Sequence, residues 1–211
     1  SITEKAANPE NVMSISVLGL SKSIKPKVLI DGSDFYSNLV LNSSADKIAW
    51  VQWQHPNMPW DANELWLADI TDKADEVTLT NAKRLILPAK FGVQACICQL
   101  LFAANGNLFF SADFKESNAG ESSANYWNVY VYNVSTEIVS QVSSGTAEYG
   151  YPHWVYGDQR IVQLNSKHLL AVASYPDGDV LSLINQDTLE TQELLKQNNT
   201  LQHLSSDGNG K

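Results

Sequence analysis

The chain has 211 residues, of which 44% are hydrophobic and 18% are charged, so it has the composition of a globular domain rather than a disordered segment. Its formal net charge of −9 argues against a nucleic-acid-binding surface, because acidic groups repel phosphate backbones. No apolar run is long enough for a transmembrane helix. We therefore expect neither nucleic acid nor a membrane among its partners.

Alternation of apolar and polar residues with a period of two runs along most of the chain and predicts β-strands. Turn signals such as Asn105-Gly106 and Asp177-Gly178 separate them. At most, residues 6–13 could form a turn or two of helix, so the predicted class is all-β. The predicted strands, in chain order, are 47–53, 64–70, 107–112, 127–134, 137–142, 160–164, 168–174, 179–185 and 190–194.

These strands repeat as a four-stranded unit with a period of about 50 to 60 residues, which is typical of β-propeller blades. The predicted blades cover residues 35–87, 93–142 and 151–195, and residues 201–211 would start the next. Residues 1–34 are predicted to be an N-terminal extension that leads into the first blade. About three to four blades do not close a ring, so we predict a partial propeller, a fragment of a larger ring. Its uncovered edges and faces favour self-association of the fragment.

Two cysteines, Cys96 and Cys98, point to the same face of a strand and are too close for an easy disulfide. We interpret them as buried, reduced core thiols, with a metal or redox role as the alternative. Reduced thiols favour a cytoplasmic location, but the sequence does not determine the compartment. No zinc, phosphate-loop or dinucleotide motif occurs, so no metal and no cofactor is predicted.

Catalytic residues are not predicted in this chain. A hydrolase nucleophile needs Gly-x-Ser-x-Gly, because only glycine tolerates the crowding around the serine. The nearest match, Gly19-Leu20-Ser21-Lys22-Ser23, fails at its last position.

Three stretches carry a resemblance beyond a generic propeller: residues 31–37 (DGSDFYS), 48–61 (IAWVQWQHPNMPWD) and 147–157 (AEYGYPHWVYG). In this order they resemble the propeller of prolyl-oligopeptidase-type serine peptidases, in the acylaminoacyl-peptidase and dipeptidyl-aminopeptidase branch. The resemblance covers the chain from about Pro26 onward. Departures include blade turns that lack the proline of the family's Ser-Pro-Asp-Gly pattern, so the chain is similar to a divergent member.

The resemblance implies a two-domain peptidase whose propeller limits access to an α/β-hydrolase domain, so that short peptides enter and folded proteins do not. That domain and its Ser, Asp, His triad would lie outside these 211 residues. The implied partners are this domain of the same polypeptide and short peptide substrates. Two alternatives stay open: a stand-alone propeller that acts as a binding scaffold, and a pseudo-enzyme whose hydrolase domain has lost its serine.

One candidate site is the proline-rich loop with His55, Asn57, Trp60 and Asp61. Such loops lie at a propeller rim, where a rigid scaffold often presents functional residues. His55, Asn57 and Asp61 would supply hydrogen bonds to the hydrolase domain or to substrate, and Trp60 an apolar wall. The alternative is a purely structural loop stiffened by its prolines.

The second candidate is Glu148, as a carboxylate facing the central chamber. Some relatives bind the free amino terminus of the substrate with acidic propeller residues, and a carboxylate suits an ammonium group by charge-assisted hydrogen bonding. The alternative is an ordinary surface glutamate at the start of a blade.

Overall fold

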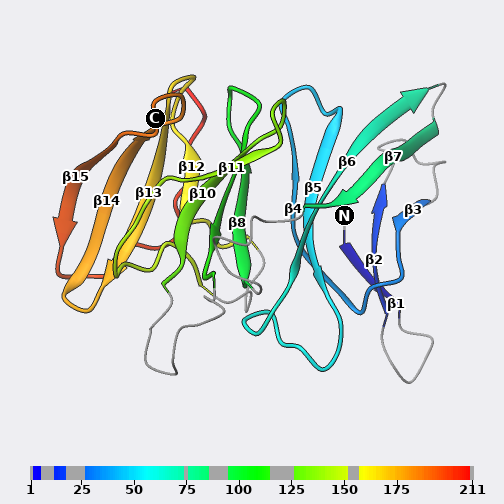
Figure 1. Ribbon diagram of the computed structural model, residues 1–211, viewed down its shortest axis with the longest axis horizontal. Coiled ribbons are helices and arrows are strands. Elements are labelled where there is room, and N and C mark those ends of the chain that lie inside the picture. The colour runs from blue at the N-terminus through cyan, green and yellow to red at the C-terminus, as the bar shows by residue number, and fades with distance from the viewer. Residues whose placement is uncertain are drawn as a thin grey trace.

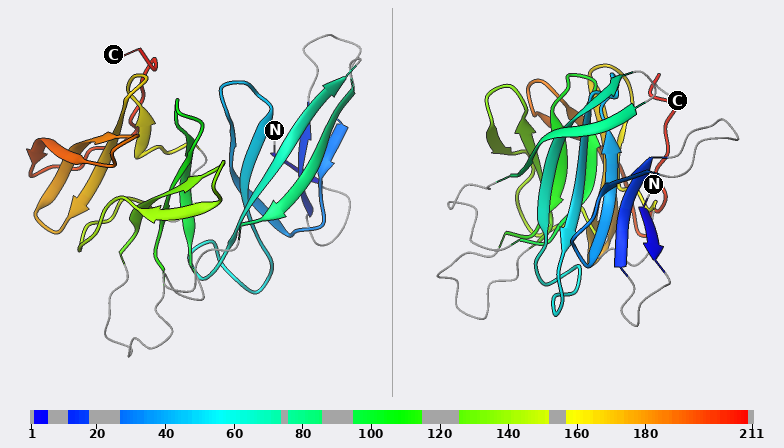
Figure 2. Two further views of the ribbon diagram at one scale, coloured as in Figure 1. Left: turned by 45° about the horizontal axis from the view of Figure 1, so that its top comes forward. Right: turned by 90° about the vertical axis from the view of Figure 1, so that its right-hand side faces the viewer.

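The computed structural model describes residues 2–5, 12–17, 27–73, 76–85, 95–114, 126–151 and 157–209. Every regular element in these ranges is a β-strand, and the strands form four antiparallel sheets. The sheets lie side by side in chain order (Figure 1), and the end-on view of Figure 2 shows them one behind another. The predicted all-β class and partial propeller are confirmed. Within the described ranges, no helix is long and apolar enough to cross a membrane.

The N-terminal region forms a three-stranded sheet, although the sequence analysis assigned it only to an extension. Its strands are β1 (Ile2–Lys5), β2 (Val12–Val17) and β3 (Lys27–Ile30). Ile15 of β2 is 1% exposed and packs into a cluster with Tyr36 and Trp50 of the next sheet. Of the predicted helical turn at 6–13, residues 6–11 lie outside the described residues, and the last two begin β2.

Three four-stranded sheets follow, and we call them the first, second and third blades. The first contains β4 (Phe35–Leu41), β5 (Lys47–Trp53), β6 (Glu64–Lys73) and β7 (Glu76–Arg84). The second contains β8 (Ile97–Phe102), β9 (Leu108–Ala112), β10 (Asn128–Asn133) and β11 (Ile138–Gln141). The third contains β12 (Ile161–Gln163), β13 (His168–Tyr175), β14 (Gly178–Asn185) and β15 (Thr191–Gln197).

In each blade the strands pair in chain order. The three blades run from Phe35 to Arg84, from Ile97 to Gln141 and from Ile161 to Gln197, and the blade boundaries predicted at 35–87, 93–142 and 151–195 stay predictions. The predicted start of a further blade at 201–211 stays a prediction, and residues 201–209 contain no strand.

Besides the cluster of Ile15, Tyr36 and Trp50, the core contains two larger clusters, one between each pair of neighbouring blades. Successive residues of a strand point to opposite faces, so Phe110 packs toward the first blade and Phe109 toward the third. Both are 0% exposed, which explains why β9 begins with a continuous apolar run, Leu108 to Phe110, instead of an alternation of apolar and polar residues. The first cluster includes Ala49, Val51, Leu65, Leu108, Phe110 and Tyr130. The second includes Phe109, Val129, Val131, Leu169, Ala171 and Ala173.

A bulge in the first strand of a blade provides a polar link to the following blade. Asn38 in β4 and Gln99 in β8 both have left-handed backbones, with φ of 51° and 56°, where the strand register shifts. The Asn38 Oδ1 accepts the Leu100 N–H at 3.3 Å. The Gln99 Oε1 accepts a hydrogen bond of 2.7 Å from the backbone N–H of Arg160. Each bulge therefore places an acceptor against the next blade, at Leu100 within β8 and at Arg160 directly before β12.

We predict that Gln99→Ala lowers the free energy of unfolding by about 1–3 kcal/mol, because it leaves the buried backbone N–H of Arg160 without an acceptor. Urea denaturation followed by tryptophan fluorescence measures the change. Gln192→Ala, on the exposed strand β15, is the matched control and should change stability by less than about 0.5 kcal/mol. Equal effects of the two changes would contradict a linking role for Gln99.

Candidate functional site

The loop between the second and third strands of the first blade and the corresponding turn of the third blade lie at one edge of the molecule, because the strands of a meander alternate in direction. Figure 1 shows the β5–β6 loop (residues 54–63) and the β13–β14 turn at the same, lower edge. Glu148 lies in the connection from β11 to β12 and bridges to the end of β13. We call this edge the loop rim. Both candidate sites therefore lie on it, on different blades.

The start of the β5–β6 loop is fixed by contacts to Asp34, directly before β4, and to Phe35, the first residue of β4. The exposed His55 donates its backbone N–H to Asp34 Oδ2 at 2.8 Å, and its ring meets Phe35 edge-on at 4.8 Å between centroids. The Asn57 N–H closes a turn onto the Gln54 carbonyl at 3.0 Å.

The end of the loop is closed by Asp61. Its Oδ2 accepts the Met58 N–H at 2.8 Å, and its own N–H donates to the Met58 carbonyl at 3.0 Å. Trp60 is half-buried and Asp61 is exposed. The four candidate residues thus share one structured loop, which supports the structural interpretation, and their role toward a partner or substrate stays a prediction.

Asn63, which the sequence analysis did not single out, ties this loop to the second blade. It is 9% exposed. Its Oδ1 accepts the Ile97 N–H at 2.8 Å, and its Nδ2 donates to the Ile97 carbonyl at 3.0 Å and to the Pro59 carbonyl at 3.2 Å. The Cys96 thiol also donates to the Pro59 carbonyl. The loop is therefore held against the start of β8 from several directions.

Both cysteines are buried, and they do not form a disulfide. Burial raises the pKa of the Cys98 thiol well above its usual value, and the neighbouring Cys96 adds to this. A thiol with a raised pKa is a poor nucleophile and a poor metal ligand. In the part of the chain that the structure describes, no group of three or more His, Cys, Asp or Glu residues could hold a metal ion.

Glu148 joins the second and third blades. Its backbone exchanges two hydrogen bonds with Ser174 at the end of β13, of 2.9 and 3.0 Å. Its carboxylate Oε2 accepts a hydrogen bond of 2.8 Å from the backbone N–H of Trp127, which lies just before β10. Burial raises the pKa of the Glu148 carboxyl, while the Trp127 N–H and the charge of Arg160 act in the opposite direction. Glu148 is therefore half-buried and engaged, rather than a loose surface residue.

Behind Glu148 lies a buried arginine that the sequence analysis missed. Arg160 is 1% exposed, and its Nη2 donates to the Ser174 hydroxyl at 2.7 Å. The same nitrogen is 4.0 Å from Asp179 Oδ2, and the guanidinium carbon lies 4.2 Å from the Tyr151 ring centroid. Nε and Nη2 also approach the Val172 carbonyl at 3.4 and 3.3 Å. The sequence signal was a single arginine placed directly before an apolar strand.

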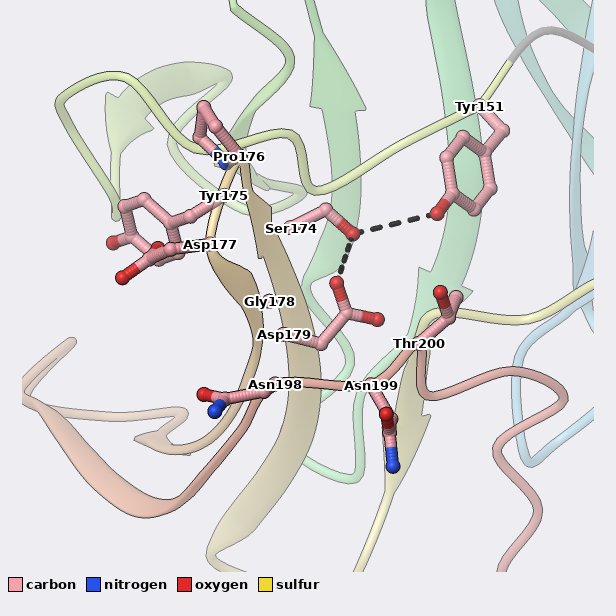
Figure 3. A pocket seen from close by; sticks show the side chains of 10 residues that line it. All are labelled: Tyr151, Ser174, Tyr175, Pro176, Asp177, Gly178, Asp179, Asn198, Asn199 and Thr200. Atoms are coloured by element: carbon pink, nitrogen blue, oxygen red, sulfur yellow. Dashed lines mark hydrogen bonds between the residues drawn. The ribbon is translucent and has the colours of Figure 1, made fainter.

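Asp179 completes this buried cluster. It is 3% exposed; its Oδ1 accepts the Ser174 hydroxyl at 2.6 Å and its Oδ2 accepts the Leu201 N–H at 2.6 Å. Ser174 and Asp179 also line a pocket of about 550 Å³ on the third blade (Figure 3). The structure thus brings Glu148 together with Arg160, Ser174 and Asp179, whereas the other four candidates belong to the first blade.

We predict that Asn63→Ala lowers the free energy of unfolding by about 1–3 kcal/mol, because it removes the partners of both backbone groups of Ile97. Urea denaturation measures the loss. Asn57→Ala, in the same loop, should cost less than about 0.5 kcal/mol. If both variants are as stable as the wild type, Asn63 does not tie the loop to the second blade.

We predict that Glu148→Gln stabilises the fold increasingly as the pH rises. A carboxyl whose pKa is raised by folding stabilises the folded state below its unfolded-state pKa near 4.5, and this contribution is lost as the pH rises through the folded-state pKa. Glutamine keeps an acceptor for Trp127 and carries no charge. Unfolding free energies of both proteins across this pH window test the sign, with Glu193→Gln on β15 as control. A variant that becomes relatively less stable with rising pH would contradict the prediction.

The sequence matches no protein-family model and no curated protein. Solved structures do match. Puromycin hydrolase superposes with a TM-score of 0.72 at 19% identity, over 92% of this chain and 28% of its own chain. A puromycin-hydrolysing peptidase of Mycobacterium tuberculosis gives 0.71 at 21% identity, with the same coverage. An oligogalacturonate lyase in complex with manganese gives 0.53 at 11% identity, over 89% of this chain and 50% of its own.

The chain therefore spans 28% of the length of these peptidases, and the matched part is their propeller. At such low identity the likeness establishes the fold and not the activity. In fold, the chain resembles the propeller domain of peptidases of the prolyl oligopeptidase family over nearly its whole length.

Proposed function

We propose that this chain is the propeller part of a serine peptidase related to prolyl oligopeptidase, and that it controls the access of short peptides to an α/β-hydrolase domain of the same polypeptide. The observation that carries the proposal is the superposition on two puromycin-hydrolysing peptidases over 92% of the chain. The lyase propeller superposes less well, with a TM-score of 0.53 against 0.72. The peptidase is therefore the better guide to function.

The loop rim is the face that would meet the hydrolase domain. Its β5–β6 loop is held firmly by Asn63 and Asp61, so it can present a defined surface. On that loop His55, Asp61 and the 47% exposed Met58 remain accessible, and Trp60 is half-exposed. This mixture of two apolar and two polar side chains suits a contact between domains of one chain, which is more polar than a core.

Glu148 is the residue of the same rim that would bind the free amino terminus of a substrate. Its backbone is held at Ser174 and one carboxylate oxygen at Trp127, so the group is pre-oriented. A carboxylate and an ammonium group form a charge-assisted hydrogen bond, which is stronger than a neutral one. The proposed substrates are short peptides and aminoacyl amides with a free amino terminus.

The test is a peptidase assay on the full-length gene product, with puromycin and with amino-free and amino-blocked chromogenic peptides. We expect hydrolysis that a serine-directed fluorophosphonate abolishes. Glu148→Gln should reduce kcat/KM for amino-free substrates by about tenfold while leaving amino-blocked substrates unchanged. Glu193→Gln, on the outer strand of the third blade, is the control and should alter neither.

Other outcomes separate the parts of the proposal. Absence of both hydrolysis and fluorophosphonate labelling would overturn the peptidase function and favour a binding scaffold, or a hydrolase domain without its serine. Equal effects of Glu148→Gln on amino-free and amino-blocked substrates would remove Glu148 from amino-terminus recognition and leave the peptidase function standing.

A further inference from the structure

The pocket on the third blade is formed where the β13–β14 turn meets the segment after β15. It has a volume of about 550 Å³, which is enough for a small-molecule ligand. Figure 3 shows the side chains of Tyr151, Ser174, Asp179 and Thr200 converging on one space from different segments of the chain. Ser174 and Asp179 come from neighbouring strands of the sheet, whereas Thr200 belongs to the segment that crosses in front of them.

The positions of these polar groups are fixed from behind by Arg160. Its guanidinium lies beyond the pocket wall, bonded to the Ser174 hydroxyl at 2.7 Å and stacked on the Tyr151 ring at 4.2 Å. The Ser174 hydroxyl donates to Asp179 at 2.6 Å and lies 3.3 Å from the Tyr151 hydroxyl. The Leu201 N–H holds the other Asp179 oxygen at 2.6 Å. Three of the wall residues are therefore pre-oriented by one buried network, as a binding site requires.

The charges around the pocket are balanced. The lining contains two carboxylates, and each has a cationic neighbour: Asp177 bonds Lys196 at 2.9 Å, and Asp179 lies 4.0 Å from Arg160. Among the described lining residues there is no unmatched charge to attract an ion. A ligand with a full charge would gain little here, because every charge it met would already be partnered.

The remaining polar groups are hydroxyls and amides, supplied by Tyr151, Thr200, Asn198 and Asn199. A hydroxyl both donates and accepts, and a side-chain amide offers two donors and an acceptor. A ligand hydroxyl can therefore donate to a carboxylate or amide oxygen while it accepts from an N–H or another hydroxyl. The rings of Tyr151 and Tyr175 add flat apolar surface to the wall. This combination suits the alternating C–H and O–H surface of a sugar.

We propose that this pocket binds an uncharged polyhydroxylated ligand, a sugar ring of pyranose or ribose size. The site is formed by the third blade and the segments on either side of it and does not depend on peptidase activity, so the two can be tested separately. The ligand would lie on the loop rim beside Ser174, whose backbone carries the bridge to Glu148.

The experiment is saturation-transfer NMR and calorimetry on the full-length gene product, with methyl β-D-glucopyranoside and D-ribose as uncharged probes. Acetate and tetramethylammonium are the charged controls. We expect saturable binding of at least one sugar with a Kd of about 1 mM. Thr200→Val and Tyr151→Phe should each weaken it by about three- to tenfold, since each removes one hydroxyl. Thr188→Val makes the same change in the β14–β15 loop at the opposite edge and should leave the Kd unchanged.

Three results would overturn the proposal: no saturable binding of either sugar, tighter binding of a charged probe, or sugar binding that neither Thr200→Val nor Tyr151→Phe weakens. Thermal unfolding of each variant establishes that it is folded before its Kd is compared. Because the readout is ligand binding, an inactive peptidase does not affect the result.

Discussion

The structure depends on one constraint: the second blade is an antiparallel sheet that has to be covered on both faces. Phe109 and Phe110 are adjacent in β9, point in opposite directions and are both completely buried. If either neighbour were removed, the sheet would expose the apolar side chains that pack against that neighbour. Individual blades therefore gain their stability from the blades beside them, as in other repeat proteins. The face-to-face arrangement of Figure 2 follows from this requirement.

The loop rim derives its geometry from the same packing. Asn63 reaches from the first blade to Ile97 of the second, and Glu148 links Trp127, directly before β10, to Ser174 of β13. Both bonds exist only because the apolar clusters bring the blades into contact. Buried polar groups are costly when unpaired, so these links also restrict how far the blades can shift relative to one another. The loop rim is rigid because the packed core holds it in place, and some of its side chains remain accessible.

Much of the fold was readable from the sequence because strands leave a local signal. The prediction of residues 47–53 agrees with β5 at both ends, and the predicted strands at 127–134 and 168–174 agree with β10 and β13 to within one residue at each end. The repeat identified the propeller before any tertiary information. The N-terminal sheet was missed because its strands are short and separated by polar segments, although the alternation of Ser14, Ile15 and Ser16 in β2 was a usable signal.

The candidate site was only partly predictable, for a physical reason. The proline-rich loop is a local feature, and its four residues do lie together. The cluster behind Glu148 is instead assembled by strand register: Ser174 pairs directly with Asp179 across the β13–β14 hairpin, and Arg160 approaches both from the position directly before β12. Arg160 and Asp179 are far apart in the sequence, and neither has a motif that points to the other. Such pairings become visible only once the sheet is built.

The bulges at Asn38 and Gln99 have a further consequence, because both bonds run in the same sense along the chain: the earlier blade supplies the acceptor and the later blade supplies the N–H. The two surfaces of a blade are thus different, and a blade can accept a neighbour on each side only in one orientation. Interfaces of this head-to-tail kind either close into a ring or continue as an open array, depending on the rotation between units. Because both bulge bonds run in the same direction along the chain, the row of blades has two different ends. Any blade that extends the row has to be added in the same orientation as the blades already in it.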